Sequence, residues 1–371
     1  MKLALFFSRG ISLATWKDSG LLDRELAPYK RMLSHMESVS FVTYGNDSEG
    51  LFLQEEDGFK VLSNRWGLPK DLYSIVSPLL YGVELRSAAI YKTNQISGWW
   101  TAGLAKFLYG KPLVVRCGYL LSMDQEQKWK KYSWLRVSLI SLLENLAFIC
   151  ADAIIVTTPE MKMEVMRRYG LPPEKINVIP NSVDTDLFRP LPEIKTIPGR
   201  LGFVGRFNNQ KNLPLLLEAV SDIEEISLIF IGGGEKRPEL ESLASALGIN
   251  IKFYANVPNR DIPELLNTCQ AFVLPSRWEG MPKALIEAMA CGLPVIGTNV
   301  SGIRDIIEHD RTGYLCEPTI DGLRSAIKII LNDSQLRKRL GETAREYVVR
   351  NFSIEKTVFK ELELLFSMEK R

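Results

Sequence analysis

The residue types best suited to chemistry gather between residues 275 and 297. Two carboxylates, Glu279 and Glu287, stand eight positions apart, with Lys283 between them. The two catalytic carboxyl groups of a glycosidase lie roughly 5–9.5 Å apart across one bond, whereas eight helical steps of about 1.5 Å separate these Cα atoms by about 12 Å. The spacing therefore favours an elongated ligand that is contacted at two points. A sugar linked to a diphosphate has that shape.

A strand, a loop and a helix must position these side chains. Residues 270–274 are mostly apolar, as in a parallel strand buried on both faces, and Pro275 ends the run. Pro282 suits the first turn of a helix that continues to Cys291 and is ended by Gly292. The charged loop therefore lies at the carboxyl end of a strand, where open α/β sheets bind ligands. The helix N-terminus beyond it favours anionic groups.

A second group of candidates lies about 70 residues upstream. A predicted strand over 201–205 is followed by Arg206 and Lys211, which flank a polar turn, and then by a helix over 212–220. Two fixed cations at the end of a strand would stabilise negative charge that develops on a diphosphate leaving group. Taken singly, such cations are more often solvated surface charges.

The N-terminal half offers a weaker candidate in its first loop. We expect a strand over 3–7, a helix over 21–35, and between them a loop that ends in Gly20. Gly20 would allow phosphate oxygens to approach backbone N–H groups at the start of the helix. The loop alone favours the simpler interpretation, in which Asp18 or Ser19 caps the helix and Gly20 has no role.

Length and composition limit the class of protein. The chain has 371 residues, a net charge of +2 and 46% hydrophobic residues, which predicts two globular domains and argues against a dedicated nucleic-acid binder. Five scattered cysteines without a C-x-x-C pair argue against a zinc site or a disulfide framework and favour a reducing, cytoplasmic location. Two histidines, His35 and His309, are expected on the surface near helix ends. The sequence predicts neither a signal peptide nor a transmembrane helix.

Residues Lys128–Trp134 interleave lysines with aromatic residues. Such a mixture suits contact with the inner face of an anionic membrane, where aromatic rings enter the headgroup region. The alternative interpretation is a solvated helix start whose aromatic residues lie in the core.

These stretches together resemble the retaining, nucleotide-sugar-dependent glycosyltransferases of the GT-B fold, family-four type, also described as glycosyl transferases group 1. The resemblance rests on residues 205–212, on 275–282 with 287–296, and on the proline-rich segment 180–190. It implies an α/β fold of two Rossmann-like domains whose parallel sheets face each other across a cleft. The N-terminal, acceptor-side domain would comprise residues 1–187 together with a returning C-terminal helix, 352–371, and the nucleotide-sugar-binding domain residues 188–351.

The resemblance also implies roles for individual residues. Arg206 and Lys211 would grip the diphosphate, and Glu279 would lie beside the transferred sugar as a nucleophile or as an electrostatic stabiliser. The remaining donor contacts would come from Gly20, Val257, Gly280, Met281, Pro282, Lys283, Leu285 and Glu287. Many relatives carry a histidine after the fourth strand of the first domain. Here Arg116 occupies that region and would contact the acceptor or the sugar.

The resulting hypothesis is a retaining hexosyltransferase that uses a UDP- or GDP-type sugar, needs neither cofactor nor metal, and builds a cell-surface polysaccharide or lipopolysaccharide on a glycan or lipid-linked acceptor. Two alternatives keep the fold and change the activity. One is a sugar-nucleotide epimerase or a phosphorylase-like enzyme. The other is a subunit that binds a nucleotide sugar without catalysis.

Overall fold

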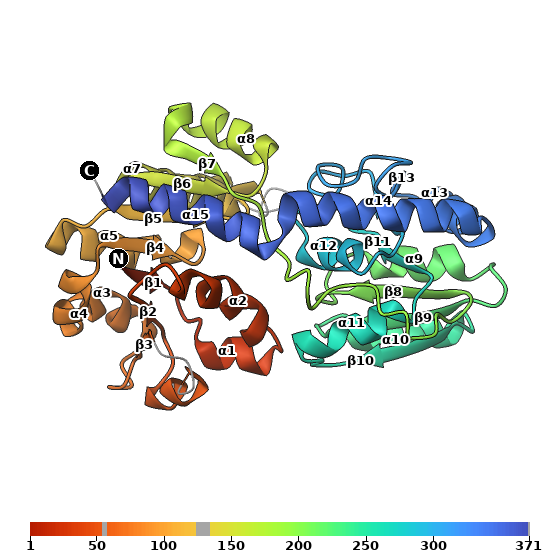
Figure 1. Ribbon diagram of the computed structural model, residues 1–371, viewed down its shortest axis with the longest axis horizontal. Helices are drawn as coiled ribbons and strands as arrows, with labels where there is room; N and C mark the ends of the chain where they lie inside the picture. Colours follow the sequence, from red (N-terminus) through yellow and green to blue (C-terminus); the bar gives the residue numbers. More distant parts are fainter. Residues whose placement is uncertain (54–57, 124–133, 370–371) are drawn as a thin grey trace. The chain divides into compact units, whose positions relative to one another are not determined.

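The computed structural model describes residues 1–53, 58–123 and 134–369. The chain divides into two compact units (Figure 1). The first comprises Met1–Pro180 with Val358–Arg371, and the second comprises Asn181–Thr357. Each is described by itself.

The first unit is built on a seven-stranded sheet in the order β3-β2-β1-β4-β5-β6-β7, and every neighbouring pair is parallel. The strands are short apolar runs, as expected where helices cover both faces of a sheet. They are β1 (Lys2–Phe6), β2 (Ser38–Val42), β3 (Phe59–Leu62), β4 (Ile90–Thr93), β5 (Leu113–Cys117), β6 (Ala153–Val156) and β7 (Ile176–Val178).

Helices cover both faces of this sheet. The α-helices of the first unit are α1 (Leu13–Asp18), α2 (Leu22–Leu33), α3 (Lys70–Leu80), α4 (Gly82–Ser87), α5 (Trp99–Tyr109), α7 (Trp134–Cys150), α8 (Pro159–Tyr169) and most of α15 (Ile354–Glu369). Tyr73 of α3, Ala102 of α5 and Phe148 of α7 share one buried cluster with strand residues. Tyr29 of α2 and Glu361 of α15 both contact Lys92 of β4, which places these two helices over the other face.

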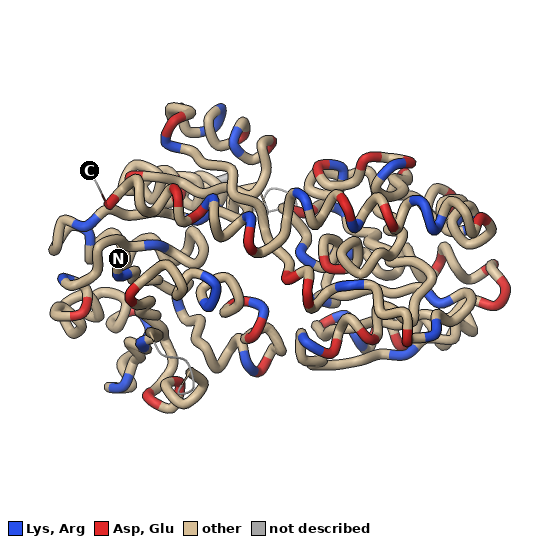
Figure 2. Tube along the Cα trace, in the orientation of Figure 1, with Lys and Arg blue, Asp and Glu red and all other residues tan. Residues whose placement is uncertain are grey.

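The second unit repeats this design on a six-stranded parallel sheet in the order β10-β9-β8-β11-β12-β13. Its strands are β8 (Arg200–Val204), β9 (Ser227–Ile231), β10 (Asn250–Tyr254), β11 (Ala271–Leu274), β12 (Val295–Thr298) and β13 (Tyr314–Cys316). Its helices are α9 (Leu213–Val220), α10 (Arg237–Ala246), α11 (Ile262–Asn267), α12 (Lys283–Ala290), α13 (Ile320–Asn332) and α14 (Ser334–Phe352). In both units the strands are largely free of charged residues, which occupy helices and loops (Figure 2).

The predicted α/β fold with two parallel-sheet, Rossmann-like units is confirmed. The units divide between residues 180 and 181 and again between 357 and 358, whereas the sequence placed these limits at 187 and 352. Backbone hydrogen bonds explain the first difference. Val183 bonds with Phe352 and Ile354 at 3.0 Å each, so the residues after Pro180 pack with the second unit.

The last helix joins the first unit through buried charges. Lys92 contacts a carboxylate oxygen of Glu361, and the two side chains are 3% and 8% exposed. Burial alone would lower the pKa of Lys92, but Glu361 and Tyr29 together outweigh it, and the pKa of Lys92 is raised. A buried ion pair is costly to break from one side, because the remaining charge is left without a partner. This pair therefore holds α15 in place on the first sheet.

Candidate active site

The strand order of the second sheet identifies where a ligand would bind. From β8 the chain proceeds to β9 and β10 on one side, and from β11 to β12 and β13 on the other. Such a reversal leaves a crevice at the carboxyl ends of the two central strands. Arg206 and Lys211 follow β8, and Glu279 follows β11, so the structure brings the two predicted groups of residues together at this point.

The closest contact in this region joins Lys211 to Glu279. The Nζ atom of Lys211 lies 2.5 Å from Oε1 of Glu279, and the two side chains are 15% and 6% exposed. Ser276 Oγ donates to the same oxygen at 2.6 Å, and Gln210 Nε2 donates to Oε2 at 3.3 Å. The carboxylate is thus held in one orientation by a cation, a hydroxyl and an amide. Lys211 and Glu279 were both predicted from the sequence as site residues, whereas the role of Gln210 was not predicted.

Gln210 also connects the two loops. Its carbonyl accepts from the N–H of Arg277 at 2.8 Å, and its side-chain amide donates to the carbonyl of Trp278 at 3.0 Å. The turn after β8 and the loop after β11 therefore form one unit. The run of polar residues in the turn, 206–211, is the feature of the sequence that could have predicted a residue bridging the two loops.

A third loop, after β12, supports Glu279 from the other side. The N–H of Glu279 donates to the carbonyl of Ser301 at 3.1 Å. The adjacent Gly302 has a φ of +80°, and a Cβ atom there would lie 2.4 Å from the carbonyl oxygen of Gly280. Glycine is therefore required for this close approach. The sequence analysis did not identify Ser301 and Gly302.

The predicted donor-binding residues after Glu279 lie at the start of α12. Pro282 precedes the helix, and Lys283 is its first residue. The N–H of Leu285 already donates to the carbonyl of Pro282 at 3.2 Å. Met281 is buried and accepts from both nitrogens of Asn181, so it anchors the segment that enters the second unit. Glu287 is buried within α12.

Val257 follows β10 at the same edge of the sheet and packs, half-buried, against the core.

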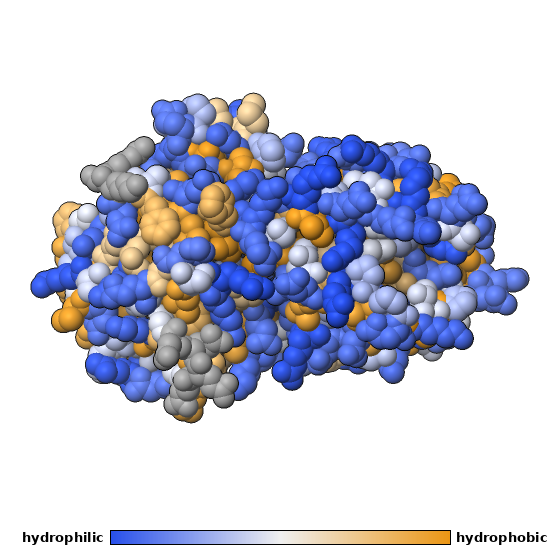
Figure 3. Space-filling model, in the orientation of Figure 1, coloured by the Kyte–Doolittle hydropathy of each residue, from blue (hydrophilic) through white to orange (hydrophobic). Residues whose placement is uncertain are grey.

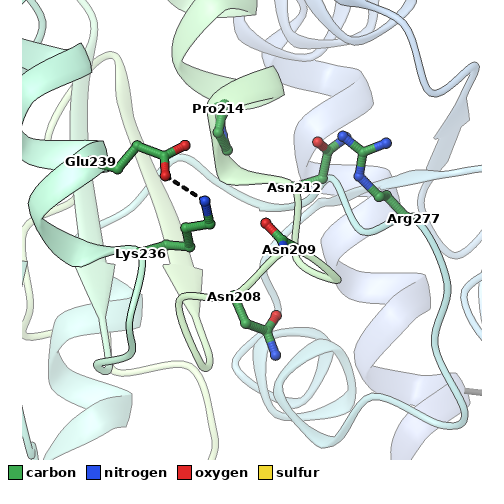
Figure 4. A pocket seen from close by; sticks show the side chains of 7 residues that line it. All are labelled: Asn208, Asn209, Asn212, Pro214, Lys236, Glu239 and Arg277. Carbon is green, nitrogen blue, oxygen red and sulfur yellow. Dashed lines mark hydrogen bonds and ion pairs between the residues drawn. The ribbon is translucent and has the colours of Figure 1, made fainter. Parts of the chain in front are cut away.

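A small depression of about 150 Å³ lies at the same edge, at the starts of α9 and α10 (Figure 4). Its lining is mostly polar and comprises Asn208, Asn209, Asn212, Pro214, Lys236, Glu239 and Arg277. Lys236 and Glu239 form an ion pair at 2.5 Å across one side of it.

Gly20 lies just before α2, at the end of the first loop, but that loop is not irregular throughout. The expected loop contains α1, whose start is capped by the Ser12 hydroxyl accepting from the N–H of Thr15. Gly20 follows this helix with a φ of +70°, and its N–H donates to the carbonyl of Lys17 at 2.9 Å. It therefore forms the turn between α1 and α2, and its N–H is already used. The glycine of the loop that directly follows β1 is Gly10, with a φ of +77°.

Arg116, the predicted acceptor or sugar contact, lies close to a carboxylate of the last helix. It lies within β5, and its side chain is 14% exposed, with one guanidinium nitrogen 4.0 Å from Oε2 of Glu361. Its N–H donates to Thr93 Oγ1 at 3.0 Å. Arg116 thus joins the buried charges beneath α15. This contact could not be predicted from the sequence, because Glu361 is 245 positions away.

Cysteine and histidine chemistry is absent from the site. All five cysteines are free, and burial raises the pKa of the Cys269 and Cys316 thiols to about 12. His35 and His309 are exposed, as predicted. No cluster of three metal-binding side chains occurs in the part of the chain that the structure describes.

The predicted membrane contact, Lys128–Trp134, lies outside the described residues except for the start of α7. Among the helices that the structure covers, none has the length and apolar character to cross a bilayer.

Comparison with known proteins agrees with this arrangement. Residues 185–347 match the family described as Glycosyl transferases group 1, and residues 42–187 match Glycosyltransferase Family 4. The chain is 28% identical to the UDP-Gal:alpha-D-GlcNAc-diphosphoundecaprenol alpha-1,3-galactosyltransferase of Escherichia coli, covering 90% of this chain and 87% of the relative. It is also 28% identical to the alpha-maltose-1-phosphate synthase of Mycolicibacterium smegmatis, covering 69% and 73%.

Solved structures give the same result for the fold. HepE of Anabaena, determined in complex with UDP and glucose, superposes with a TM-score of 0.79 at 19% identity, covering 99% of this chain and 100% of that chain. The matched families, the strand order and the fold together identify the chain as a member of the GT-B glycosyltransferases of the family-four type.

Proposed function

We propose that this protein is a retaining glycosyltransferase that transfers a hexose from a nucleoside diphosphate sugar to a glycan or lipid-linked glycan. The observation that carries the proposal is the Lys211–Glu279 pair, held at the carboxyl ends of β8 and β11 by Ser276 and Gln210. A cation and a carboxylate in fixed contact suit a reaction in which a phosphate leaves and positive charge develops on the sugar.

Lys211 would bind the diphosphate while it remains in contact with Glu279. An ammonium group has three N–H donors, so contact with one carboxylate oxygen leaves others for phosphate oxygens. Arg206 is exposed beside this turn and would supply a second, planar cation that is able to bind phosphate through two hydrogen bonds. The first N–H groups of α12, at Lys283 and Ala284, would add a further contact to the diphosphate.

The sugar would lie over residues 279–282. Glu279 would face the anomeric carbon, and the backbone of Gly280, Met281 and Pro282 would meet the sugar hydroxyls. Glu287 would accept hydrogen bonds from the ribose, which requires its buried carboxylate to become accessible when donor binds. Val257 would lie beside the base.

The reaction that fits these groups is a displacement on one face of the sugar. The bond from the anomeric carbon to the phosphate oxygen breaks, and a bond to the acceptor oxygen forms on the same face. The departing phosphate takes the proton of the acceptor hydroxyl. Glu279 stabilises the positive charge of the oxocarbenium-like state, and Arg206 and Lys211 stabilise the negative charge of the leaving diphosphate. These two cations perform the neutralisation for which other transferases use a metal ion.

The acceptor is proposed from the relatives. The Escherichia coli relative, which this chain matches over 90% of its length, acts on a sugar diphosphate linked to undecaprenol. A lipid-linked glycan in the assembly of a surface polysaccharide, at the inner face of the membrane, is therefore the acceptor class that we propose.

The test is a thermal-shift titration with UDP, GDP, ADP and their sugar conjugates, with and without EDTA. A ligand that binds the native state raises its stability by RT ln(1 + [L]/Kd), so the true donor raises the melting temperature. We expect one base to stabilise the protein equally in the presence and absence of EDTA. A response that needs a divalent cation would contradict the proposed role of the two cations. No response to any nucleotide would contradict the proposed donor.

A further inference from the structure

Helix α7 presents an apolar stripe to solvent. Six of its aliphatic side chains are between 43% and 61% exposed: Leu135, Leu139, Leu142, Leu143, Leu146 and Ile149. They recur every three or four residues, which places them along one side of the helix. Its described face carries no exposed acidic side chain, because Glu144 is buried and accepts from the N–H of Leu121 and the hydroxyl of Tyr169.

The stripe continues onto neighbouring helices. Gly103 of α5 allows close contact with α7, since a Cβ atom there would lie 3.2 Å from Sγ of Cys150. Tyr109 of α5 donates to the carbonyl of Pro78 in α3. Further large apolar side chains are exposed on these helices and on α4, with Phe107 86% and Val83 81% exposed: Leu72, Ile75, Leu79, Leu80, Val83, Trp100, Phe107 and Leu108. Together with the α7 stripe they form what we call the apolar face.

Figure 3 shows apolar side chains on the surface of the first unit, in the region where Figure 1 labels α3, α4 and α5. Monomeric soluble proteins rarely expose contiguous apolar patches larger than a few hundred Å², and larger ones mark interaction sites.

Cations border the apolar face. Lys106 donates to the carbonyl of Cys150 at the end of α7, and Lys175 donates to that of Ile149. Arg86 lies 5.3 Å from the centre of the Tyr109 ring on α5. Arg136 is exposed near the start of α7, and Lys111 follows α5 by two residues. Three acidic residues also lie on or beside these helices: Asp152, which is paired with Lys106, Asp71 of α3, which is paired with Arg9, and Glu84 of α4.

We propose that the apolar face docks on the surface of an anionic phospholipid bilayer. Its leucine, phenylalanine and tryptophan side chains would enter the boundary between headgroups and acyl chains, and the bordering cations would contact lipid phosphates. None of the described helices, α7 included, is long and apolar enough to cross a bilayer, and an exposed apolar stripe suits a helix that lies in the interface. The surface is distinct from the Lys211–Glu279 site, so the inference does not depend on the proposed reaction.

The charges favour a bilayer over a second copy of this chain. A two-fold interface brings the same surface of both protomers together, so the bordering cations would face one another. Like charges across an interface are unfavourable. An anionic lipid surface complements the same cations, each of which adds to binding near such a surface.

The test measures co-sedimentation of the whole protein with vesicles of phosphatidylcholine alone or of phosphatidylcholine with phosphatidylglycerol. We expect binding to the anionic vesicles that weakens at high salt. The triple variant Leu139→Ser, Leu142→Ser, Leu146→Ser should bind at least about tenfold more weakly, because each loses buried apolar area at the interface. The control triple Ile329→Ser, Val349→Ser, Phe359→Ser removes exposed apolar side chains elsewhere and should bind as the wild type does.

Circular dichroism and the melting temperature show whether each variant is folded. A second variant, Lys111→Glu with Arg136→Glu, keeps the apolar side chains and should lose the preference for anionic vesicles. The inference is overturned if the wild type does not sediment with anionic vesicles, or if the folded α7 triple binds as tightly as the control triple. It is also overturned if sedimentation velocity shows that the wild type is a dimer and that the α7 triple variant is a monomer.

Discussion

Lys211 Nζ lies 2.5 Å from Oε1 of Glu279, although the two residues are 68 positions apart in the sequence. The pair joins the turn after β8 to the loop after β11, which are the loops at the two central strands of the second sheet. The charges that we propose for catalysis and the connection between the two loops therefore depend on one contact. A substitution here affects both activity and stability, and experiments must separate the two effects.

Replacement of Lys211 with alanine is expected to abolish transfer and weaken donor binding, because the diphosphate loses a fixed cation. It also leaves the buried Glu279 carboxylate without its cation, which costs about 3–5 kcal/mol of unfolding free energy. The double variant Lys211→Met, Glu279→Gln removes both charges and should recover most of that stability without recovering transfer. Transfer rates and chemical denaturation measure the two quantities. Unchanged transfer by Lys211→Ala would exclude the proposed role of this cation.

Gly302→Ala is expected to lower both stability and activity. Its φ is +80°, and the new Cβ would approach the carbonyl of Gly280 to 2.4 Å, so the loop that carries Glu279 must move. Gly248 offers a matched control, since its φ is +66° and no atom lies within 4 Å of a Cβ built there. Gly248→Ala should cost about 1 kcal/mol from backbone strain alone and leave transfer unchanged. Equal effects of the two substitutions on transfer would contradict the supporting role of Gly302.

Lys92→Met is expected to destabilise the protein by about 3–5 kcal/mol, because Glu361 is left buried without Lys92. The double variant Lys92→Met, Glu361→Met should be nearly as stable as the wild type. Lys338→Met serves as a control, because its pair with Glu342 is exposed and such pairs contribute less than about 1 kcal/mol. Denaturant titration of the four proteins distinguishes these outcomes, and an equal loss in the single and double variants would contradict the interpretation.

The same pair gives the stability a pH dependence. The folded pKa of Lys92 is raised, so its stabilising contribution is complete below the unfolded value, about pH 10, and is lost as pH rises through the folded value. Burial also raises the pKa of Tyr29, which acts in the same direction. We therefore expect the melting temperature to fall steeply above about pH 10, and less steeply in the Lys92→Met, Glu361→Met variant.

The cysteines are expected to react slowly with Ellman's reagent in the native protein near pH 8. Burial raises the pKa of each thiol, and four of the five are fully buried, while Cys150 is half-buried. The thiolate is the reactive form, so both protonation and access oppose the reaction. All five thiols should react at once in denaturant. A fast native phase of more than one thiol would contradict the burial of these side chains.

The sequence predicted the second unit better than the first because its candidate site residues directly follow apolar strands and stand in one dense motif. Arg206, Lys211 and Glu279 could be placed at strand ends by local pattern alone. Gln210 and Gly302 could not, since their roles depend on loops that meet through tertiary packing. The short helix α1 was missed because six residues give little periodic signal.

Edge strands were missed for a similar reason. Phe59–Leu62 has four residues, of which Leu62 alone is fully buried, so its pattern resembles that of a loop. For a different reason, the contact of Arg116 could not be predicted. A cation within a strand suggests an open site, and the carboxylate that contacts it comes from a helix near the other end of the chain.

The position of helix α15 in the sequence affects the order in which the two units can fold during translation. The second unit is one continuous segment, whereas the first is completed by residues that follow it. During translation residues 181–357 can therefore close into a folded body before Glu361 leaves the ribosome, although domains usually fold in order from the N-terminus. Until then Lys92 contacts Tyr29 but lacks the carboxylate of Glu361. The N-terminal unit is thus the last to mature, and nascent chains that stall before residue 361 would be those most in need of a chaperone.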